Sequence, residues 1–478
     1  MGESLSHQTR KGLYWKFFDQ FATIGMQFIV GIFMARVLSP TDYGITALPA
    51  VFLTIANIFI DGSFAAALIR KKELTEKDLS TSFYYSLGVG SLMYLLLFFA
   101  APYIALFYKT PIITSLVRVT SITFFLGPLT TPQTVILTRK LDFKTPARIS
   151  VINKTISGII GIVMAYTGFG LWSLVVSSLS ASFLGLIQIW LAVKWIPRER
   201  FSKQSFSYLW NFGNKLVIQR LINTVYSNIA PLLLGKLGST TDLGNYYRAQ
   251  NYATLPSTNV VGVLTSVTFP VLSKLQDEKE RLSYNYRRMI KVSAFVCFPM
   301  MILLAALSRP LILVMITEKW ESCILLLQIL CFAFMWQPIQ ILNINLLQVL
   351  ARTDLTLKLE IIKKPVCAIV VIIALHFGVV YFCIAEVLLQ VFALAINTYY
   401  TGKFINVGFG LQMKDIAPAF LMSVSSGGIV LAINYFISNL FLQILVGGTI
   451  GLTFYLAIAI IARMPEIQDV RYLLNQKR

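Results

Sequence analysis

The sequence is poor in the residues on which most metalloenzymes and acid–base catalysts depend. Its 478 residues include 2 histidines, His7 and His376, and 5 cysteines, with no CxxC pair among them. Zinc sites need clustered His and Cys ligands, and a Ser–His–Asp triad needs a histidine beside its nucleophile. The sequence also lacks a GxxxxGK(S/T) phosphate-binding loop, so we do not expect it to hydrolyse ATP. These absences argue against an enzyme and predict no metal and no other cofactor.

Charge is the second scarcity, and it indicates the class of protein. Charged residues make up 13% of the chain, against about 25% in soluble domains, while hydrophobic residues make up 56% and the mean hydropathy is +0.71. A bilayer core about 30 Å thick is crossed by roughly 20 helical residues. We therefore expect an all-α polytopic membrane protein with about 14 transmembrane helices. The expected spans are residues 12–37, 42–64, 80–106, 112–137, 146–166, 169–193, 207–235, 244–272, 289–316, 322–350, 356–377, 379–402, 414–437 and 439–462.

Two local features refine this prediction. The first span follows a polar stretch and has no small-residue cleavage site, so we expect it to be retained rather than removed as a signal peptide. Pro128 and Pro132 lie inside the span 112–137 and are expected to kink it, because proline interrupts the helical hydrogen-bond ladder.

The charges that are present are unevenly distributed. The net charge is +20, which by itself invites a nucleic-acid partner. If the N-terminus is cytoplasmic, however, roughly thirty Lys and Arg fall on the cytoplasmic side, as the positive-inside rule requires. The basic residues left on the other side are Arg36, Lys109, Arg118, Lys236, Arg309 and Lys319. We therefore expect no nucleic-acid partner, and a multi-pass chain with both termini in the cytoplasm.

The chain repeats itself at an interval of about two hundred residues. The stretch SPTDYG at 39–44 returns as STTDLG at 239–244. Two further pairs of similar stretches follow in the same order: RKLDF (139–143) with ARTDL (351–355), and GFGLW (168–172) with HFGVV (376–380). Six spans in each copy preserve the topology, so we expect parallel repeats related by an axis along the membrane normal.

This repeat predicts the domain organisation. Residues 1–200 form an N-terminal lobe, residues 201–405 form a C-terminal lobe, and residues 406–478 add two helices and a cytoplasmic tail. In the repeated hexapeptide, the aspartates are expected to cap the helices that follow them. The glycines that close the hexapeptides, Gly44 and Gly244, are expected to let backbones pack closely.

Several expected spans carry polar residues along one helical face. The stripe in the first span consists of Lys16, Gln20, Thr23 and Gln27, with Asp19 beside it. The corresponding residues of the seventh and eighth spans are Arg220, Asn223, Arg248 and Asn251. A charge that faces lipid costs several kcal/mol, so such stripes face the bundle interior or a water-filled cavity. Polar stripes in two repeated halves are typical of a transporter.

The repeat motif and three later stretches resemble a known family. These stretches are LLLGKLGSTTDLGNYYRAQNYATLP (232–256), VTFPVLSKLQDEKERL (267–282) and EKWESCILLLQIL (318–330). Together with SPTDYG they resemble the Wzx-like polysaccharide flippases of the MOP superfamily, of the O-antigen or colanic-acid-exporter type. The resemblance implies two six-helix lobes in a V-shape with two extra C-terminal helices. It also implies a substrate, an oligosaccharide on undecaprenyl diphosphate, that crosses the bacterial inner membrane by alternating access. Polysaccharide polymerase machinery and membrane lipids are further partners that it suggests.

Such a substrate needs cationic and amide side chains inside the spans. The planar guanidinium of Arg can donate two hydrogen bonds to one phosphate group, and amides can hydrogen-bond sugars. The predicted substrate-binding residues are Arg220, Arg248, Lys16, Lys154, Asn223, Asn251, Gln20 and Gln27. The predicted ion-coupling carboxylates are Asp19, Asp61 and Glu386. We predict no catalytic residue and no metal ligand.

Structural roles compete with several of these predictions. Arg248 lies close to a span end, from which its side chain can snorkel to the interface. Lys16 can act as an anchor at the cytoplasmic end of its span, and Asp19 can simply neutralise it. Asp61 and Glu386 can be solvated carboxylates near helix ends.

Three other functions compete with the flippase. A cation-coupled exporter of drugs or small molecules would belong to the same superfamily, but it predicts an acidic rather than a basic cavity. A polysaccharide polymerase or ligase would need a large outer catalytic loop, and all expected outer loops are short. A purely structural membrane protein would not need a repeat or polar stripes. The sequence does not choose between protons, sodium and membrane potential as the energy source.

Overall fold

The computed structural model describes the backbone of residues 5–469, which is helical and has no strand in that range. Side chains are described throughout this range except at residues 5–14 and 16–18 and at a few positions in two later helices. The chain divides into two compact units, Met1–Gly244 and Asn245–Arg478. The all-α class expected from the sequence is therefore confirmed over the described residues.

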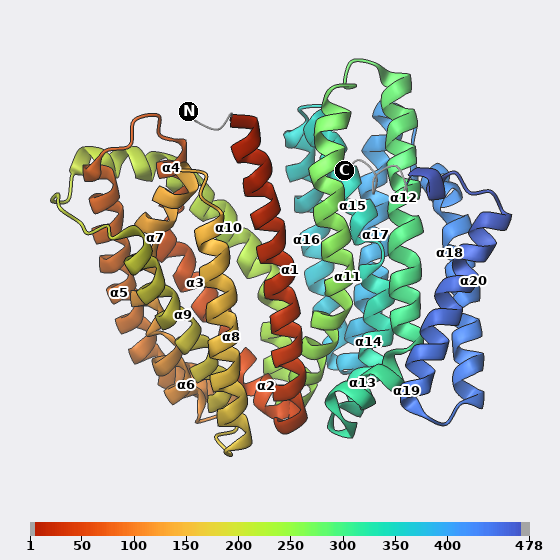
Figure 1. The fold of residues 1–478 in the computed structure, drawn as a ribbon, viewed down its shortest axis with the longest axis horizontal. Helices are drawn as coiled ribbons and strands as arrows, with labels where there is room; N and C mark the ends of the chain where they lie inside the picture. The colour runs from red at the N-terminus through yellow and green to blue at the C-terminus, as the bar shows by residue number, and fades with distance from the viewer. Residues whose placement is uncertain (1–4, 470–478) are drawn as a thin grey trace. The chain divides into compact units, whose positions relative to one another are not determined.

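The first unit is built from ten helices in its described part. They are α1 (Leu5–Val37), α2 (Pro40–Ala47), α3 (Ala50–Asp61), α4 (Phe64–Arg70), α5 (Glu76–Tyr108), α6 (Ile113–Thr120), α7 (Thr123–Arg139), α8 (Lys144–Tyr166), α9 (Trp172–Val193) and α10 (Lys203–Leu237). Helix α1 packs along α8, and α8 packs along α9 (Figure 1). Helix α10 packs against α3, α4 and α5, which places the seventh expected span in this unit.

The second unit contains most of α11 (Thr240–Ser273) and all later helices. They are α12 (Lys279–Ala306), α13 (Ser308–Ile316), the 3-10 turn η1 (Glu318–Trp320), α14 (Glu321–Phe334), α15 (Gln337–Val349), α16 (Thr353–His376), α17 (Val379–Ile405), α18 (Phe409–Phe436), α19 (Leu440–Leu442), the π-helical turn η2 (Gln443–Gly447) and α20 (Gly448–Ile461). Helices α12 and α18 pack side by side, and α20 packs against α18 (Figure 1).

Eleven helical segments of the described chain are long and apolar enough to cross a membrane. Each overlaps one of the expected spans. The other three expected spans fall on α10, α11 and α16, which are long but more polar. These three helices carry charged residues away from their ends, Arg220 on α10, Arg248 on α11 and Lys363 on α16, and charge inside a membrane helix is costly.

Several expected spans are broken into shorter helices, among them 289–316 (α12 and α13) and 322–350 (α14 and α15). The span 42–64 becomes α2 and α3, which are separated at Pro49. Helix α3 is followed by Gly62, whose φ of +51° is left-handed. The span 112–137 becomes α6 and α7, with the break at Ser121 and Ile122. The two prolines expected to kink this span lie inside α7, which continues through them.

The repeated hexapeptide forms the same local structure twice. Ser39 and Asp42 make a capping box at α2, in which the Asp42 backbone N–H donates to Ser39 Oγ over 3.2 Å and the Ser39 N–H donates to Asp42 Oδ2 over 2.9 Å. Ser239 and Asp242 repeat this arrangement at α11 with distances of 3.0 and 3.3 Å. Both helices are capped by the hexapeptide, but the N-cap residue is the serine, and the aspartate predicted to cap lies at the third helical position.

The two hexapeptides also lie against each other. A Cβ on Gly44 would fall 1.7 Å from the Thr240 carbonyl oxygen, and a Cβ on Gly244 would fall 1.8 Å from that of Pro40. The hydroxyls of Thr41 and Thr241 share a hydrogen bond of 2.9 Å. Glycine is required at both positions because only hydrogen fits between the backbones, so the predicted close packing is confirmed.

Candidate functional site

An ion pair joins α10 to the end of α3 in the first unit. Arg220 Nη1 lies 2.5 Å from Asp61 Oδ2, and the two side chains are 51% and 36% exposed. The structure therefore brings together one predicted substrate-binding residue and one predicted coupling carboxylate. Because the pair is half-exposed, its net stabilisation is small, about 0–1 kcal/mol. A guanidinium held this weakly can exchange its carboxylate for another anion.

Polar groups continue along α10 beyond this ion pair. Asn223 is exposed, and its backbone carbonyl accepts a hydrogen bond of 2.9 Å from the Ser227 hydroxyl. Asn228 Nδ2 donates to the Thr224 carbonyl over 2.8 Å. Residues three and four apart share one helical face, so Arg220 and Asn223 lie together on α10. This face can offer a cation and amide groups to one ligand.

A second polar cluster lies between α1 and α8. The Thr23 hydroxyl donates to Asp19 Oδ1 over 3.2 Å and lies 3.0 Å from the Ser150 hydroxyl on α8. Lys154 follows Ser150 by one turn and is partly buried. Gln20 and Gln27 are exposed on α1. The side chain of Lys16 lies outside the described residues.

Arg248 occupies a different environment in the second unit. It is 8% exposed, and its guanidinium lies over the rings of Trp320 at 5.2 Å and Tyr252 at 5.6 Å. A guanidinium over an aromatic face gains roughly 0.5–2 kcal/mol, more when desolvated. Asn251, three residues on, is exposed. Of these two predicted substrate-binding residues, Arg248 is therefore buried and Asn251 is exposed.

Glu386 on α17 is the end of a short hydrogen-bonded chain. Gln250 Nε2 donates to the Tyr246 hydroxyl over 3.0 Å, and that hydroxyl donates to Glu386 Oε1 over 2.9 Å. Glu386 Oε2 is buried and has no hydrogen-bond partner within the described part of the chain. A buried acceptor without a partner is costly for a carboxylate and favours binding of a proton or cation.

Sequence reasoning missed a charged cluster in the middle of α16. Lys363 is 7% exposed, and its Nζ lies 2.6 Å from Glu360 Oε1 and 3.1 Å from Asn397 Oδ1 on α17. Lys364 Nζ lies 3.9 Å from the other oxygen of Glu360. The signal was visible in the sequence as two adjacent lysines before Pro365, inside the expected span 356–377.

Two further polar groups, also missed, hold helices of the second unit together. Arg287 on α12 makes two hydrogen bonds of 2.7 Å to the carboxylate of Asp415 on α18. Gln412 Nε2 donates to Asn343 Oδ1 over 3.0 Å and to Thr401 Oγ1 over 3.1 Å. Buried amide and hydroxyl groups that satisfy one another in this way fix helix packing. Over the described residues no cluster of three His, Cys, Asp or Glu side chains could hold a metal ion.

Comparison with known proteins adds a family and a fold. The profile of the family described as "Polysaccharide biosynthesis protein" matches residues 33–325. Among similar proteins, the teichuronic acid biosynthesis protein TuaB of Bacillus subtilis is 25% identical over 355 residues, covering 74% of this chain and 73% of its own. The lipopolysaccharide biosynthesis protein WzxC of Escherichia coli is 23% identical over 366 residues, covering 75% and 74%.

Solved structures share the architecture. The lipid II flippase MurJ in an inward closed conformation matches with a TM-score of 0.71 at 16% identity, covering 94% of this chain and 99% of its own. An inward-facing multidrug resistance MATE transporter of the MOP superfamily matches with a TM-score of 0.62 at 14% identity, covering 80% and 96%. At these identities the likeness establishes the fold alone.

Proposed function

Because this chain belongs to the polysaccharide biosynthesis protein family, we propose that it flips undecaprenyl-diphosphate-linked oligosaccharide repeat units across the bacterial inner membrane. The coarser function is that of the family: the chain is a multi-pass transporter that serves polysaccharide biosynthesis, it has the fold of MOP-superfamily structures, and it is not an enzyme. The resemblance to Wzx-like flippases drawn from the sequence is therefore confirmed. The lipid carrier, the direction of transport and the cationic path are the proposal.

The observation that carries the proposal is that basic side chains lie within the three long helices that are not among the eleven apolar segments. Arg220 lies on α10, Arg248 on α11, and Lys363 and Lys364 on α16. A lipid-linked diphosphate needs positive charge inside the membrane, because its own charge would otherwise be stranded in hydrocarbon. Lys154 and Lys16 would add positive potential from α8 and α1. A drug exporter would not need this excess of basic groups.

Arg220 is the residue we expect to contact the diphosphate. Its ion pair with Asp61 is half-exposed, so replacing the carboxylate by a phosphate oxygen costs little. The guanidinium can then donate two parallel hydrogen bonds to the phosphate. Asn223 on the same face would hydrogen-bond the first sugar, and Gln20, Gln27 and Asn251 would offer further amides. Asp61 would keep the site neutral when the substrate is absent.

Glu386 is the residue we expect to couple transport to an ion. It has one carboxylate oxygen held by Tyr246 and a second that is buried without a partner in the described chain. Asp19, which accepts a hydrogen bond from Thr23, is the corresponding candidate in the first unit. We assign both termini to the cytoplasm, since this placement satisfies the positive-inside rule. Polymerase machinery that consumes the flipped unit is the expected partner.

The test is the fate of the lipid-linked glycan in cells. We expect lipid extracts from cells without this protein to accumulate an undecaprenyl-diphosphate-linked repeat unit, detected by mass spectrometry. Wild-type protein should clear it, and the Arg220→Ala variant should not. Arg309→Ala is the matched control, because Arg309 is also paired with a carboxylate, Glu321 at 3.2 Å, but at an exposed helix end. If nothing accumulates and surface polysaccharide is unchanged, the substrate is wrong and the drug exporter becomes the better interpretation.

A further inference from the structure

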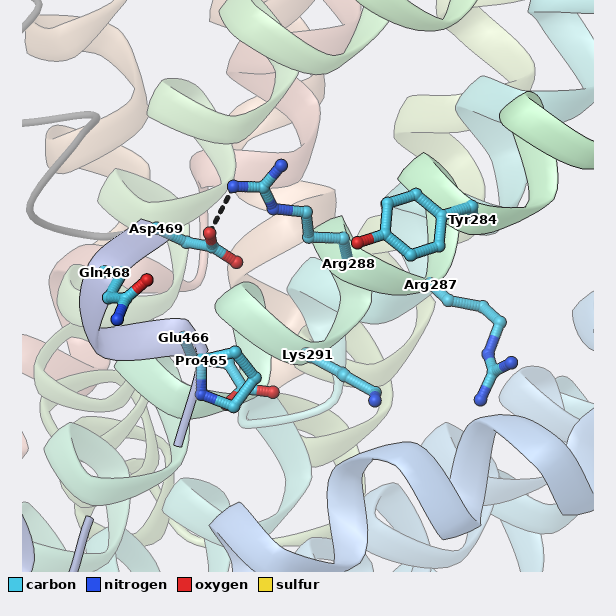
Figure 2. Close-up of a pocket in the computed structure, with 8 residues that line it drawn as sticks. All are labelled: Tyr284, Arg287, Arg288, Lys291, Pro465, Glu466, Gln468 and Asp469. Atoms are coloured by element: carbon cyan, nitrogen blue, oxygen red, sulfur yellow. Dashed lines mark hydrogen bonds and ion pairs between the residues drawn. The ribbon is translucent and has the colours of Figure 1, made fainter. Parts of the chain in front are cut away.

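A pocket lies in the second unit where α12 begins and the chain leaves α20. Its volume is about 360 Å³, within the range of pockets that hold small molecules, about 300–1,000 Å³. The lining residues are Tyr284, Arg287, Arg288, Lys291, Pro465, Glu466, Gln468 and Asp469 (Figure 2). The apolar segments Lys279–Ala306 and Leu440–Ile461 each have one end close to the pocket, and the ends of membrane spans lie at the interface. The pocket therefore sits at the level of lipid headgroups.

The basic side chains of the pocket differ in how fully they are paired. Arg287 takes both oxygens of Asp415 at 2.7 Å and points away from the 465–469 segment (Figure 2). Arg288 pairs with Asp469. Lys291 lies 3.5 Å from Asp415, whose carboxylate already has its better partner in Arg287. The Lys291 ammonium therefore has capacity for another anion.

The acidic side of the pocket is Glu466. This residue is 4% exposed, and its Oε2 is buried without a hydrogen-bond partner in the part of the chain that the structure describes. No ion pair within 4.0 Å joins Glu466 to Lys291 or to another described residue. A buried carboxylate without a donor carries a desolvation cost of several kcal/mol unless a cation meets it. A small cationic hydrogen-bond donor would satisfy the Glu466 carboxylate.

We propose that this pocket binds the phosphoethanolamine headgroup of a phospholipid. Its ammonium would donate to Glu466, and its phosphate would accept from Lys291, with the Tyr284 hydroxyl and Arg288 beside it. An anionic headgroup without an amine would leave the Glu466 carboxylate without a cationic partner, and a simple cation would give the Lys291 ammonium no further anion. One zwitterion satisfies both charges, which lie in the same pocket but do not pair with each other.

The surroundings suit a lipid rather than a free metabolite. Ile460 and Ile461, at the end of α20, are 64% and 80% exposed a few residues before Pro465. Exposed aliphatic side chains beside a headgroup pocket offer a surface for acyl chains. The proposal adds a lipid-binding site in the second unit and does not depend on which glycan is carried.

The test compares lipid binding by purified full-length protein. We expect native mass spectrometry of the protein mixed with single lipids to show retention of phosphatidylethanolamine over phosphatidylglycerol and phosphatidylcholine. Phosphatidylcholine is the informative comparison, because its quaternary ammonium cannot donate a hydrogen bond to Glu466. Soluble phosphoethanolamine should compete for the site, and inorganic phosphate at the same concentration should not.

Variants assign the effect to the pocket. Glu466→Gln should weaken phosphatidylethanolamine binding on the order of tenfold and leave phosphatidylglycerol binding unchanged. Lys291→Gln should weaken both. Glu278→Gln is the control, since this exposed residue pairs with Arg281 at the start of the same helix. Equal binding of the three lipids by wild-type protein would overturn the proposal, as would undiminished binding by folded Glu466→Gln. The wild-type competition decides the question if the variants do not fold.

Discussion

The contact between the two repeated hexapeptides gives the sharpest test of the structure. We predict that Gly44→Ala destabilises the first unit, because the added methyl would meet the Thr240 carbonyl oxygen at 1.7 Å. This obstacle is backbone and not the end of a flexible side chain, so a helix must move. Gly244→Ala should do the same through the Pro40 carbonyl at 1.8 Å.

The size of the effect follows from two opposing terms. Forcing a methylene into a tight contact costs about 1–3 kcal/mol, and occasionally more. Alanine in place of a helical glycine returns roughly 0.5–1 kcal/mol through helix propensity. We therefore expect a net loss of about 1–2 kcal/mol for each variant, or a Tm lower by roughly 2–8 °C. The double variant should lose less than the sum, since one displacement relieves both clashes.

Thermal unfolding of detergent-purified protein, followed by size-exclusion chromatography, measures this loss. Gly127→Ala is the matched control, because nothing lies within 4 Å of a Cβ at that helical position. The control should be as stable as wild type, or slightly more so. If Gly44→Ala and Gly244→Ala have the same Tm as Gly127→Ala, the two hexapeptides are not in contact, and the close packing described above is wrong.

Three other substitutions test the candidate site. Arg220→Ala should lower the transport rate about 10- to 150-fold, because it removes a charged hydrogen bond worth about 1.5–3 kcal/mol. Its Tm should change little, because the ion pair with Asp61 is partly exposed. A large fall in Tm would instead show that the role of Arg220 is structural. Lys363→Met should destabilise the protein by about 1–3 kcal/mol, because Glu360 would keep only its 3.9 Å contact with Lys364. Adding Glu360→Gln should recover part of that loss in a denaturation series. Glu386→Gln should leave Tm near wild type but flatten the pH dependence of flipping in proteoliposomes, whereas an unchanged pH profile would remove this residue from ion coupling.

Much of the fold could be predicted from periodicity and composition. Hydrophobic runs of about 20 residues locate membrane helices because each span must satisfy its backbone hydrogen bonds internally. The hexapeptide caps could be predicted because Ser and Asp three residues apart satisfy the first free N–H groups of a helix. The breaks were less predictable: the interruption between α6 and α7 falls at Ser121 and Ile122, while the prolines that attract attention lie within α7.

The candidate site was harder to predict, since burial and partners depend on tertiary packing. Arg220 and Arg248 are the same residue type and both lie within expected spans. Arg220, however, pairs with a half-exposed carboxylate, whereas the buried Arg248 lies against two aromatic rings. The partner of Arg220, Asp61, is 159 residues away. Lys363 was not predicted, because it belongs to a compact cluster and not to a stripe of several polar residues along one helical face.

Charged residues are scarce in the membrane helices, so each one that is present needs a structural or functional explanation. A long helix in lipid can keep a charge only if that charge finds a partner, a cavity or the interface. Arg287 has found its partner in Asp415, and Arg248 has found aromatic faces. Arg220 has a partner that it can leave at little cost, because both side chains are partly exposed. A transporter must bind its substrate and then release it, so the weakly held cation, and not the most deeply buried one, is where we expect the diphosphate to bind.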